Sequence, residues 1–319
     1  MGGAYVNNFN QLQGRVAIVS GGARGIGLAI VKTLASQGVK VVIADNGSNI
    51  NGTNFEIDFV KKIADELGPN VIAIPRSVSK SADAKYIVDF TNNELGGVDI
   101  LVNNAAIIRD SFIFKGEPDD FDSVLRTNLS GAWYLTNSVA PIMRQQTKEG
   151  RGGEPYNWGR IINITSTAGF YGNFGQSPYA SSKSGMLGLM RTTAMDLNRA
   201  GITCNSIAPF AATRVTETIK PANDEQSSYK ERALKISPKH VAIVVAWLCS
   251  EKSQQITGQL FGVRGREVFL FSQPRPVAKI TSDADWEIDS LDESASRSFS
   301  ALYTDLKTDL EEFSSEPKV

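Results

Sequence analysis

A glycine-rich turn between a buried strand and a helix constrains the fold of this chain more than any other feature. Residues 16–19 are all apolar, residues 20–27 read Ser-Gly-Gly-Ala-Arg-Gly-Ile-Gly, and a helix is expected over residues 28–37. Short, fully apolar runs are typical of strands in parallel sheets, which are buried on both faces. Glycine permits the tight turn and a close approach of backbone to a phosphate group. The segment therefore predicts the first unit of a nucleotide-binding α/β fold.

Strands and helices alternate along most of the chain. This alternation predicts a Rossmann-type, doubly wound, seven-stranded parallel sheet with helices on both faces. We expect this domain to span residues 1–272, followed by a C-terminal extension over residues 273–319, and residues 268–271 are a candidate for one more strand. The seven expected strands cover residues 16–19, 39–45, 71–74, 99–102, 160–165, 202–207 and 259–263.

The C-terminal extension carries a regular apolar pattern. Its apolar residues are spaced 3, 4, 4 and 3 positions apart, which places them on one face of a helix. The pattern predicts an amphipathic helix over residues 299–313 that docks on the domain or on a partner subunit. A solvated tail is the alternative. The residues of this pattern are Phe299, Leu302, Leu306, Leu310 and Phe313.

Composition excludes several classes of function. The formal net charge of the 319-residue chain is -1 and no basic run stands out, so nucleic-acid binding is not expected. No apolar run is long enough to cross a bilayer, and the first residues do not have the pattern of a signal peptide. One histidine, His240, and two distant cysteines, Cys204 and Cys249, leave little for a metal site. We predict a cytoplasmic protein with no metal, no nucleic-acid partner and no membrane contact.

The glycine turn indicates a dinucleotide cofactor. Gly21, Gly25 and Gly27 precede a helix whose N-terminal N–H groups and positive dipole end suit a pyrophosphate. Asp45 ends the second strand, where a carboxylate bonds a ribose 2′-hydroxyl and repels a 2′-phosphate. This favours NAD over NADP, although Arg24 is a counter-signal because it is able to hold a phosphate. A purely structural glycine turn, with Asp45 as a turn or N-cap residue, is the alternative.

Three residues form a candidate catalytic group. Tyr179 and Lys183 are four positions apart in an expected helix and so share a face, while Ser166 ends the fifth strand. Ligands of open α/β sheets bind at the carboxyl ends of strands, where Asn104 also falls. A free tyrosine has a pKa near ~10, and a nearby lysine ammonium favours the phenolate. Tyr179 is therefore a candidate proton donor and acceptor at a carbinol oxygen.

These motifs together resemble the short-chain dehydrogenase/reductase family over about residues 10–270. The segments SGGARGIG, NNAA and YASSK carry the likeness, with Ser166 and Asn128. The resemblance implies that Tyr179 is the acid/base, that Lys183 binds the nicotinamide ribose and tunes Tyr179, and that Ser166 orients the substrate. It implies that Asn128 holds a water in a proton relay and that Asn104 supports the sheet beside the cofactor. A helix-bending or capping role is the alternative for Asn128.

A narrower likeness concerns the substrate. The segments DNGSNING, FYGNFGQSPYASSK, NSIAPFAATRVTET and VVAWLCSE resemble the (3R)-hydroxyacyl-CoA dehydrogenase units of peroxisomal multifunctional enzyme type 2. The likeness implies NAD-linked oxidation of a 3-hydroxyacyl thioester, or the reverse reduction, by a homodimer or homotetramer paired through helices near 120–145 and 178–199. The alternatives are the same chemistry on a steroid, sugar or other secondary alcohol, and a non-catalytic nucleotide-binding regulatory or scaffold protein.

Some positions depart from the family pattern. Ser77 stands where an aspartate usually contacts adenine, Phe210 stands where glycine usually follows Pro209, and Ala106 replaces the last glycine of N-N-A-G. None of these removes a catalytic group, and the segment 210–235 is expected to set specificity. The residues expected to contact the cofactor are Gly21, Arg24, Gly25, Ile26, Gly27, Asp45, Ser77, Val78, Asn104, Ala105, Tyr179, Lys183 and Pro209.

Overall fold

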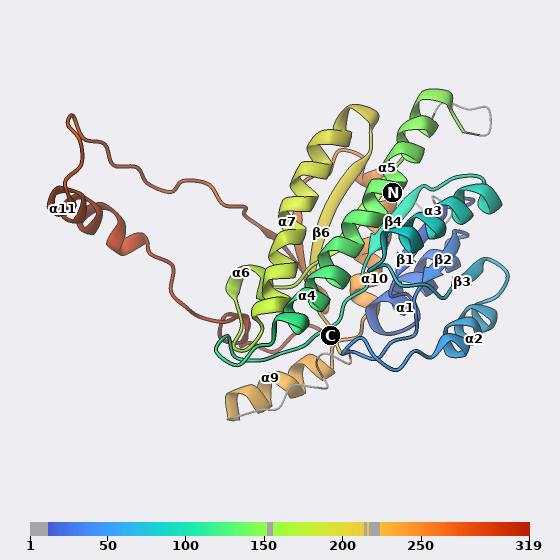
Figure 1. The fold of residues 1–319 in the computed structure, drawn as a ribbon, viewed down its shortest axis with the longest axis horizontal. Helices are drawn as coiled ribbons and strands as arrows, with labels where there is room; N and C mark the ends of the chain where they lie inside the picture. Colours follow the sequence, from blue (N-terminus) through green and yellow to red (C-terminus); the bar gives the residue numbers. More distant parts are fainter. Residues whose placement is uncertain (1–11, 152–155, 214–215, 217–223) are drawn as a thin grey trace, which may run out of the picture.

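The computed structural model describes residues 12–151, 156–213, 216 and 224–319, and it contains one eight-stranded sheet covered by helices (Figure 1). Part of the expected specificity segment 210–235 therefore lies outside the described residues. The strand order is β3-β2-β1-β4-β5-β6-β7-β8. The strands are β1 (Val16–Ser20), β2 (Lys40–Ala44), β3 (Val71–Ile74), β4 (Ile100–Asn103), β5 (Arg160–Ile164), β6 (Thr203–Phe210), β7 (Leu260–Arg264) and β8 (Glu267–Phe271).

The helices follow the expected alternation. Within the described ranges, none of them is both long and apolar enough to cross a membrane. The α-helices are α1 (Gly25–Ser36), α2 (Ile57–Leu67), α3 (Ser81–Leu95), α4 (Pro118–Leu125), α5 (Gly131–Glu149), α6 (Ala168–Tyr171), α7 (Ser177–Leu197), α9 (Asp224–Leu234), α10 (Lys239–Cys249), α11 (Ile288–Phe299) and α12 (Asp309–Glu312). The shorter turns are the π-helix η1 (Arg126–Ser130) and the 3₁₀ turns η2 (Asn198–Ala200), η3 (Glu251–Ser253) and η4 (Ser300–Leu302).

The sheet differs from the expected one at its last strand. Strands β1 to β7 are parallel, as predicted, but the candidate strand near 268–271 is formed as β8 and pairs antiparallel with β7. Arg264 pairs with Glu267, so the two residues between them make a tight hairpin in which Gly265 has φ +59°. An antiparallel neighbour needs only such a hairpin, whereas another parallel strand requires a long crossover. The seven predicted parallel strands are therefore all present, and the sheet has one further, antiparallel strand at the position of the candidate strand 268–271.

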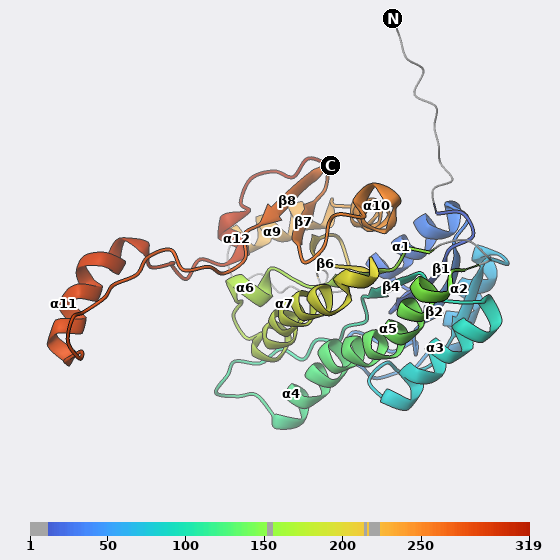
Figure 2. The ribbon, with the colours of Figure 1, turned by 90° about the horizontal axis from the view of Figure 1, so that it is seen from above.

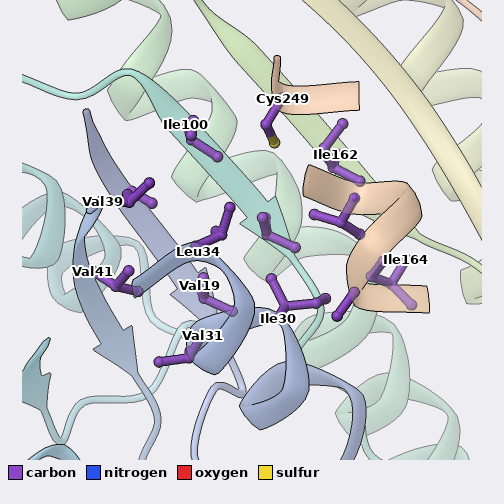
Figure 3. Close-up of a cluster of buried hydrophobic side chains, with 14 of the residues drawn as sticks. Val19, Ile30, Val31, Leu34, Val39, Val41, Ile100, Ile162, Ile164 and Cys249 are labelled. Carbon is purple, nitrogen blue, oxygen red and sulfur yellow. The ribbon is translucent and has the colours of Figure 1, made fainter. Parts of the chain in front are cut away.

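Alternating residues of the strands fill two separate cores, one on each face of the sheet. Val19 and Val41 face the helices α1, α2 and α10, where they pack with Ile30 and Leu34 (Figure 3). Ile18, on the same strand as Val19, faces α3, α5 and α7 instead. Full burial of such side chains contributes about 1.5–3 kcal/mol each. Both faces of the sheet are thus apolar, which explains the continuous apolar runs in the sequence.

The strand order places a crevice at one edge of the sheet. The chain moves from β1 outward to β3, and then returns to the other side of β1 to form β4. The connection after β1 runs to β2 on one side, and the connection after β4 runs to β5 on the other side. The two connections therefore separate at the carboxyl ends of β1 and β4 and leave a crevice between them. Asp45 and Asn104 directly follow β2 and β4, and Ser166 is the second residue after β5, so all three lie at this edge.

The prediction of a single amphipathic helix over residues 299–313 is wrong. The chain leaves the domain after β8, forms α11 at the end of a projecting arm, and returns in extended form to α12 (Figures 1 and 2). Leu306, expected on the buried helix face, is 96% exposed. Thr308 begins a new helix through a capping box, in which its backbone N–H donates to Glu311 Oε2 at 2.7 Å. Apolar spacing specifies a helix only where a surface exists to cover that face, and here the domain covers Leu310 and Phe313 but not Leu306.

Candidate active site

The glycine turn has the close packing that the sequence predicted. Gly21 and Gly25 have φ of +63° and +53°, a region that side chains rarely adopt. A Cβ on Gly27 would lie 2.1 Å from the carbonyl oxygen of Gly21, so α1 contacts the end of β1 only because Gly27 has no side chain. The Asn104 Nδ2 donates to the carbonyl oxygens of Ser20 and Gly21, at 3.0 Å each. The turn is therefore held open toward the crevice, with the N-terminus of α1 facing it.

Asp45 and Arg24 have partners that bear on cofactor choice. The Asp45 carboxylate accepts hydrogen bonds from the backbone N–H groups of Ala23 at 3.0 Å and Gly47 at 2.8 Å. Arg24 is an ion-pair partner of Glu56, and its guanidinium lies 4.0 Å from the centre of the Phe59 ring. Arg24, the counter-signal for a 2′-phosphate, thus has Glu56 as an acidic partner, while each Asp45 oxygen retains acceptor capacity.

One cavity of about 1260 Å³ runs along the carboxyl edge of the sheet. The glycines of the turn line one part of the cavity and leave room for an extended dinucleotide, and Ser166, Tyr179 and Lys183 line another part. The residues present therefore fit such a cofactor with a substrate beside it. Asn128, by contrast, lies outside the lining. The lining includes every residue expected to contact the cofactor: Gly21, Arg24, Gly25, Ile26, Gly27, Asp45, Ser77, Val78, Asn104, Ala105, Tyr179, Lys183 and Pro209.

Tyr179, Lys183 and Ser166 converge at the inner end of this cavity. Tyr179 and Lys183 share one face of α7, with the Lys183 Nζ 5.6 Å from the centre of the Tyr179 ring. Lys183 is buried and donates from Nζ to the carbonyl oxygen of Ile164 at 2.7 Å. Ser166 hydrogen-bonds Tyr179 and thereby favours its phenolate. The predicted convergence of three side chains from β5 and α7 is therefore formed.

The pKa values of Tyr179 and Lys183 differ from those that the sequence led us to expect. Burial raises the pKa of Tyr179 to about 12, against the opposing hydrogen bond from Ser166. Burial also lowers the pKa of Lys183 to about 8, because an ammonium is costly away from water. Lys183 alone therefore does not make Tyr179 a phenolate at neutral pH. A further positive charge next to Tyr179, such as an oxidised nicotinamide ring would supply, would lower the pKa of Tyr179 and favour the phenolate.

Asn128 lies behind the cavity in the π-helix η1, at the junction of α4 and α5. Its Oδ1 accepts from the Ile107 N–H at 2.8 Å, and its Nδ2 donates to the Ile107 carbonyl oxygen at 3.0 Å and to Ser182 Oγ at 3.2 Å. Its side chain thus ties the segment after β4 to α7. Single π-turns inside helices are frequently found at functional sites. The helix irregularity that the sequence left as an alternative is present, and it positions the neighbouring Tyr179 helix.

Two cavity residues come from the C-terminal extension and were missed by the sequence reasoning. Asp309 and Leu310 line the same cavity as Ser166 and Tyr179. Phe210, noted as a bulky departure, packs against Phe313 of the extension with ring centres 4.7 Å apart. The signal available in the sequence was the Thr308-x-x-Glu311 capping box, which starts a helix at Asp309 and thus excludes a single helix over 299–313.

This fold and site define a Rossmann-type oxidoreductase that depends on a nicotinamide dinucleotide. A family model described as short chain dehydrogenase matches residues 15–227. The chain belongs to the short chain dehydrogenase family. In the described ranges, no group of three His, Cys, Asp or Glu side chains is arranged to hold a metal ion.

Individual relatives agree with this assignment. The hydroxyacyl-CoA dehydrogenase ChsB1 of Mycobacterium tuberculosis is 33% identical over 276 residues, covering 86% of this chain and 85% of that protein. The peroxisomal multifunctional enzyme A of Dictyostelium discoideum is 35% identical over 252 residues, 78% of this chain; the match spans 52% of that longer protein. The structure of 3-ketoacyl-(acyl-carrier-protein) reductase from Brucella melitensis, complexed with NADH, matches with a TM-score of 0.69 and 26% identity, covering 80% of this chain and 98% of that one.

Proposed function

We propose that this protein transfers a hydride between NAD and the carbinol carbon of a 3-hydroxyacyl thioester, in either direction. The observation that carries the proposal is the convergence of Ser166, Tyr179 and Lys183 at the end of a cavity whose other end is the glycine turn. The hydroxyacyl-CoA dehydrogenase and multifunctional-enzyme relatives support the thioester as substrate. When bound, the nicotinamide ring accepts or donates the hydride.

The chain's own residues then manage the proton and the substrate oxygen. Tyr179 takes the hydroxyl proton during oxidation and returns it during reduction, and Ser166 donates a hydrogen bond that holds the substrate oxygen in line. Lys183 binds the nicotinamide ribose, and Asn128 holds a water in the proton relay to Lys183. Because Asn128 is buried and bonded to Ile107 and Ser182, it is also suited to keep α7 in place.

We propose NAD as the preferred cofactor rather than NADP. Asp45 lies in the cavity at the end of β2 and would accept a hydrogen bond from the ribose 2′-hydroxyl while repelling a 2′-phosphate. Arg24, the residue that argued for NADP, is paired with Glu56. Calorimetry with both cofactors tests this, because NAD should bind at least about tenfold more tightly. Equal affinities would reject the proposed role of Asp45.

The absorbance of reduced nicotinamide tests the reaction itself. Purified protein is supplied with NAD or NADP and a panel of secondary alcohols that includes (3R)- and (3S)-hydroxyacyl-CoA. We expect turnover with NAD and the 3R thioester. Turnover only with steroid, sugar or simple alcohols would keep the chemistry and reject the thioester. Absence of turnover across the panel, with NAD bound, would favour the non-catalytic alternative.

We further propose a homodimer or homotetramer. Trp133 on α5 is 50% exposed and Met195 on α7 is 73% exposed, so the outer faces of these helices carry large apolar groups in contact with solvent. The projecting arm offers a second such surface, since Ile288 and Leu306 are exposed as well. Sedimentation velocity at micromolar concentration should give a dimer or larger, and a monomer would reject this.

A further inference from the structure

The C-terminal extension returns from its arm and is fixed against the domain over residues 308–319. The buried Arg264 of β7 donates from Nη2 to the carbonyl oxygen of Phe313 at 3.2 Å and also bonds Ser315. The backbone N–H of Arg266 donates to the carbonyl oxygen of Lys318 at 2.6 Å. These bonds hold this segment, which we call the tail, against the β7–β8 hairpin.

The tail enters the cavity at its catalytic end. The Phe313 ring packs between Phe210, at 4.7 Å, and Phe269, at 5.3 Å, measured between ring centres. This packing places α12 against residues 165–167, the loop between β5 and α6, which we call the Ser166 loop. Asp309 is 9% exposed, and its Oδ2 accepts a hydrogen bond from Thr167 Oγ1 at 2.6 Å. Thr167 directly follows Ser166, so the tail is attached next to the residue proposed to hold the substrate oxygen.

The carboxylate of Asp309 faces a cavity rather than a cation. Its hydrogen-bond donors are the Thr167 hydroxyl and the backbone N–H groups of Asp309 itself and Leu310, all of them neutral. Burial is the main cause of the raised pKa of Tyr179, and the negative charges of Asp110 and Asp309 add to it, so Asp309 is close enough to act on the Tyr179 hydroxyl. Burial raises the pKa of Asp309, while the hydrogen bonds from Thr167 and the two backbone N–H groups oppose this rise and favour the carboxylate. In its charged form, Asp309 acts strongly on any ligand group placed beside it, because little water screens it.

We propose that the tail is a fixed wall of the substrate pocket, and that Asp309 is a specificity-determining residue that selects neutral acyl groups over acyl groups with a carboxylate near the reacting carbon. This inference rests on the function proposed above, since it concerns the acyl part of the same thioester. The Asp309 carboxylate repels a second anion and accepts a hydrogen bond from a hydroxyl or amide group of a neutral substrate.

Two thioesters of equal carbon number test the proposal. 3-Hydroxyvaleryl-CoA has a neutral acyl chain, and 3-hydroxyglutaryl-CoA has a carboxylate at the end of the same chain. For the wild-type protein we expect a higher kcat/KM for the neutral thioester. In Asp309→Asn, which keeps the shape and removes the charge, this preference should shrink by about tenfold, chiefly through a gain with the carboxylated thioester.

Two further variants separate the effect of the Asp309 charge from the effect of the packing of the tail. Asp305→Asn makes the same chemical change at an exposed position of the extension, and it should leave the preference unchanged. Phe313→Ala removes a ring that anchors the tail but keeps the charge of Asp309. It should lower kcat/KM for both thioesters by a similar factor, with a lower melting temperature and little change in their ratio.

The outcomes are distinguishable. Turnover of the neutral thioester with an unchanged preference in Asp309→Asn would overturn the role of Asp309 and leave the proposed function intact. An equal change of preference in Asp305→Asn would show a general charge effect and would also overturn it. Failure of the wild-type protein to oxidise either thioester, while it oxidises another secondary alcohol with NAD, would overturn the proposed substrate and this inference together.

Discussion

The two edges of the parallel sheet each contain a tyrosine with a raised pKa, but the groups around the two hydroxyls differ. At the amino-terminal edge, the Tyr156 hydroxyl donates to Asp99 Oδ1 at 2.6 Å. At the carboxyl-terminal edge, the Tyr179 hydroxyl has Ser166 beside it and an open cavity in front of it. Burial raises the pKa of both phenols, that of Tyr156 further than that of Tyr179.

At the amino-terminal edge, the Asp99 carboxylate has its partners within the protein. Asp99 is fully buried and accepts from the Val16 N–H at 2.7 Å as well as from Tyr156. It also forms ion pairs with Arg15, at 3.7 Å, and with Arg151. Each carboxylate oxygen of Asp99 thus has a partner within the protein, and Asp99 does not line the cavity that contains Tyr179. The comparison teaches that a strongly shifted pKa does not by itself mark an active site; the cavity and the unused bonding capacity do.

The strongest test of this contrast replaces each tyrosine by phenylalanine. Tyr179→Phe removes the proton-transfer group, so we expect turnover to fall by about 10³-fold while NAD affinity stays within a factor of about three. Tyr156→Phe makes the same change at the other edge, and it should keep turnover per folded molecule while losing about 1–2 kcal/mol of stability. Steady-state kinetics with cofactor titration measure both, and full activity in Tyr179→Phe would contradict the assignment.

A second test breaks the amino-terminal cluster. Asp99→Asn leaves Arg15 and Arg151 without their buried anion, and breaking buried pairs in this way costs about 3 kcal/mol or more. We expect the free energy of unfolding in urea to fall by about that amount, with kcat/KM of the folded protein unchanged. A loss of catalysis larger than the loss of folded protein would show that the two edges are coupled.

The third test measures what the carboxyl-terminal edge costs in stability. The pKa of Lys183 is about 8 in the folded protein and about 10.4 in an unfolded chain. Between these pH values the unfolded state therefore binds more protons than the folded state. The contribution of Lys183 to the free energy of unfolding is thus full above pH ~10 and is lost as the pH falls through 8. Between pH 8 and 10, the cofactor-free protein should gain about 2 kcal/mol relative to Lys183→Met.

Urea unfolding at both pH values measures this difference. Lys40→Met removes an exposed lysine at the start of β2 and serves as the matched control, for which no such difference is expected. A Lys183→Met variant whose stability depends on pH as the wild-type protein does would mean that Lys183 keeps its proton when buried.

The sequence predicts the carboxyl-terminal edge well because its requirements are local. Gly21, Gly25 and Gly27 are required by backbone geometry within one turn, and Tyr179 and Lys183 meet because they are four residues apart on one helix. The strands are readable because both faces of the sheet are apolar. Every residue predicted to contact the cofactor lines one cavity, although the roles of these residues stay predictions.

The features that the sequence did not predict depend on partners distant along the chain. Thr167 and Asp309 are 142 residues apart, and no local pattern indicates that they meet. Leu306 fits a helical spacing, but it is exposed because no surface lies against it. The pKa of Tyr179 likewise depends on how deeply α7 is buried, and the spacing to Lys183 does not reveal that.

The attachment of the tail to the Ser166 loop has a consequence for the order in which the protein matures. Domains generally fold as units, and the N-terminal part of a chain is available to fold first during synthesis. All residues expected to contact the cofactor are made by residue 209, whereas Asp309 follows after all eight strands. We therefore expect nascent chains to acquire affinity for the cofactor well before they can discriminate between substrates, so that the choice of substrate is the last property this protein gains.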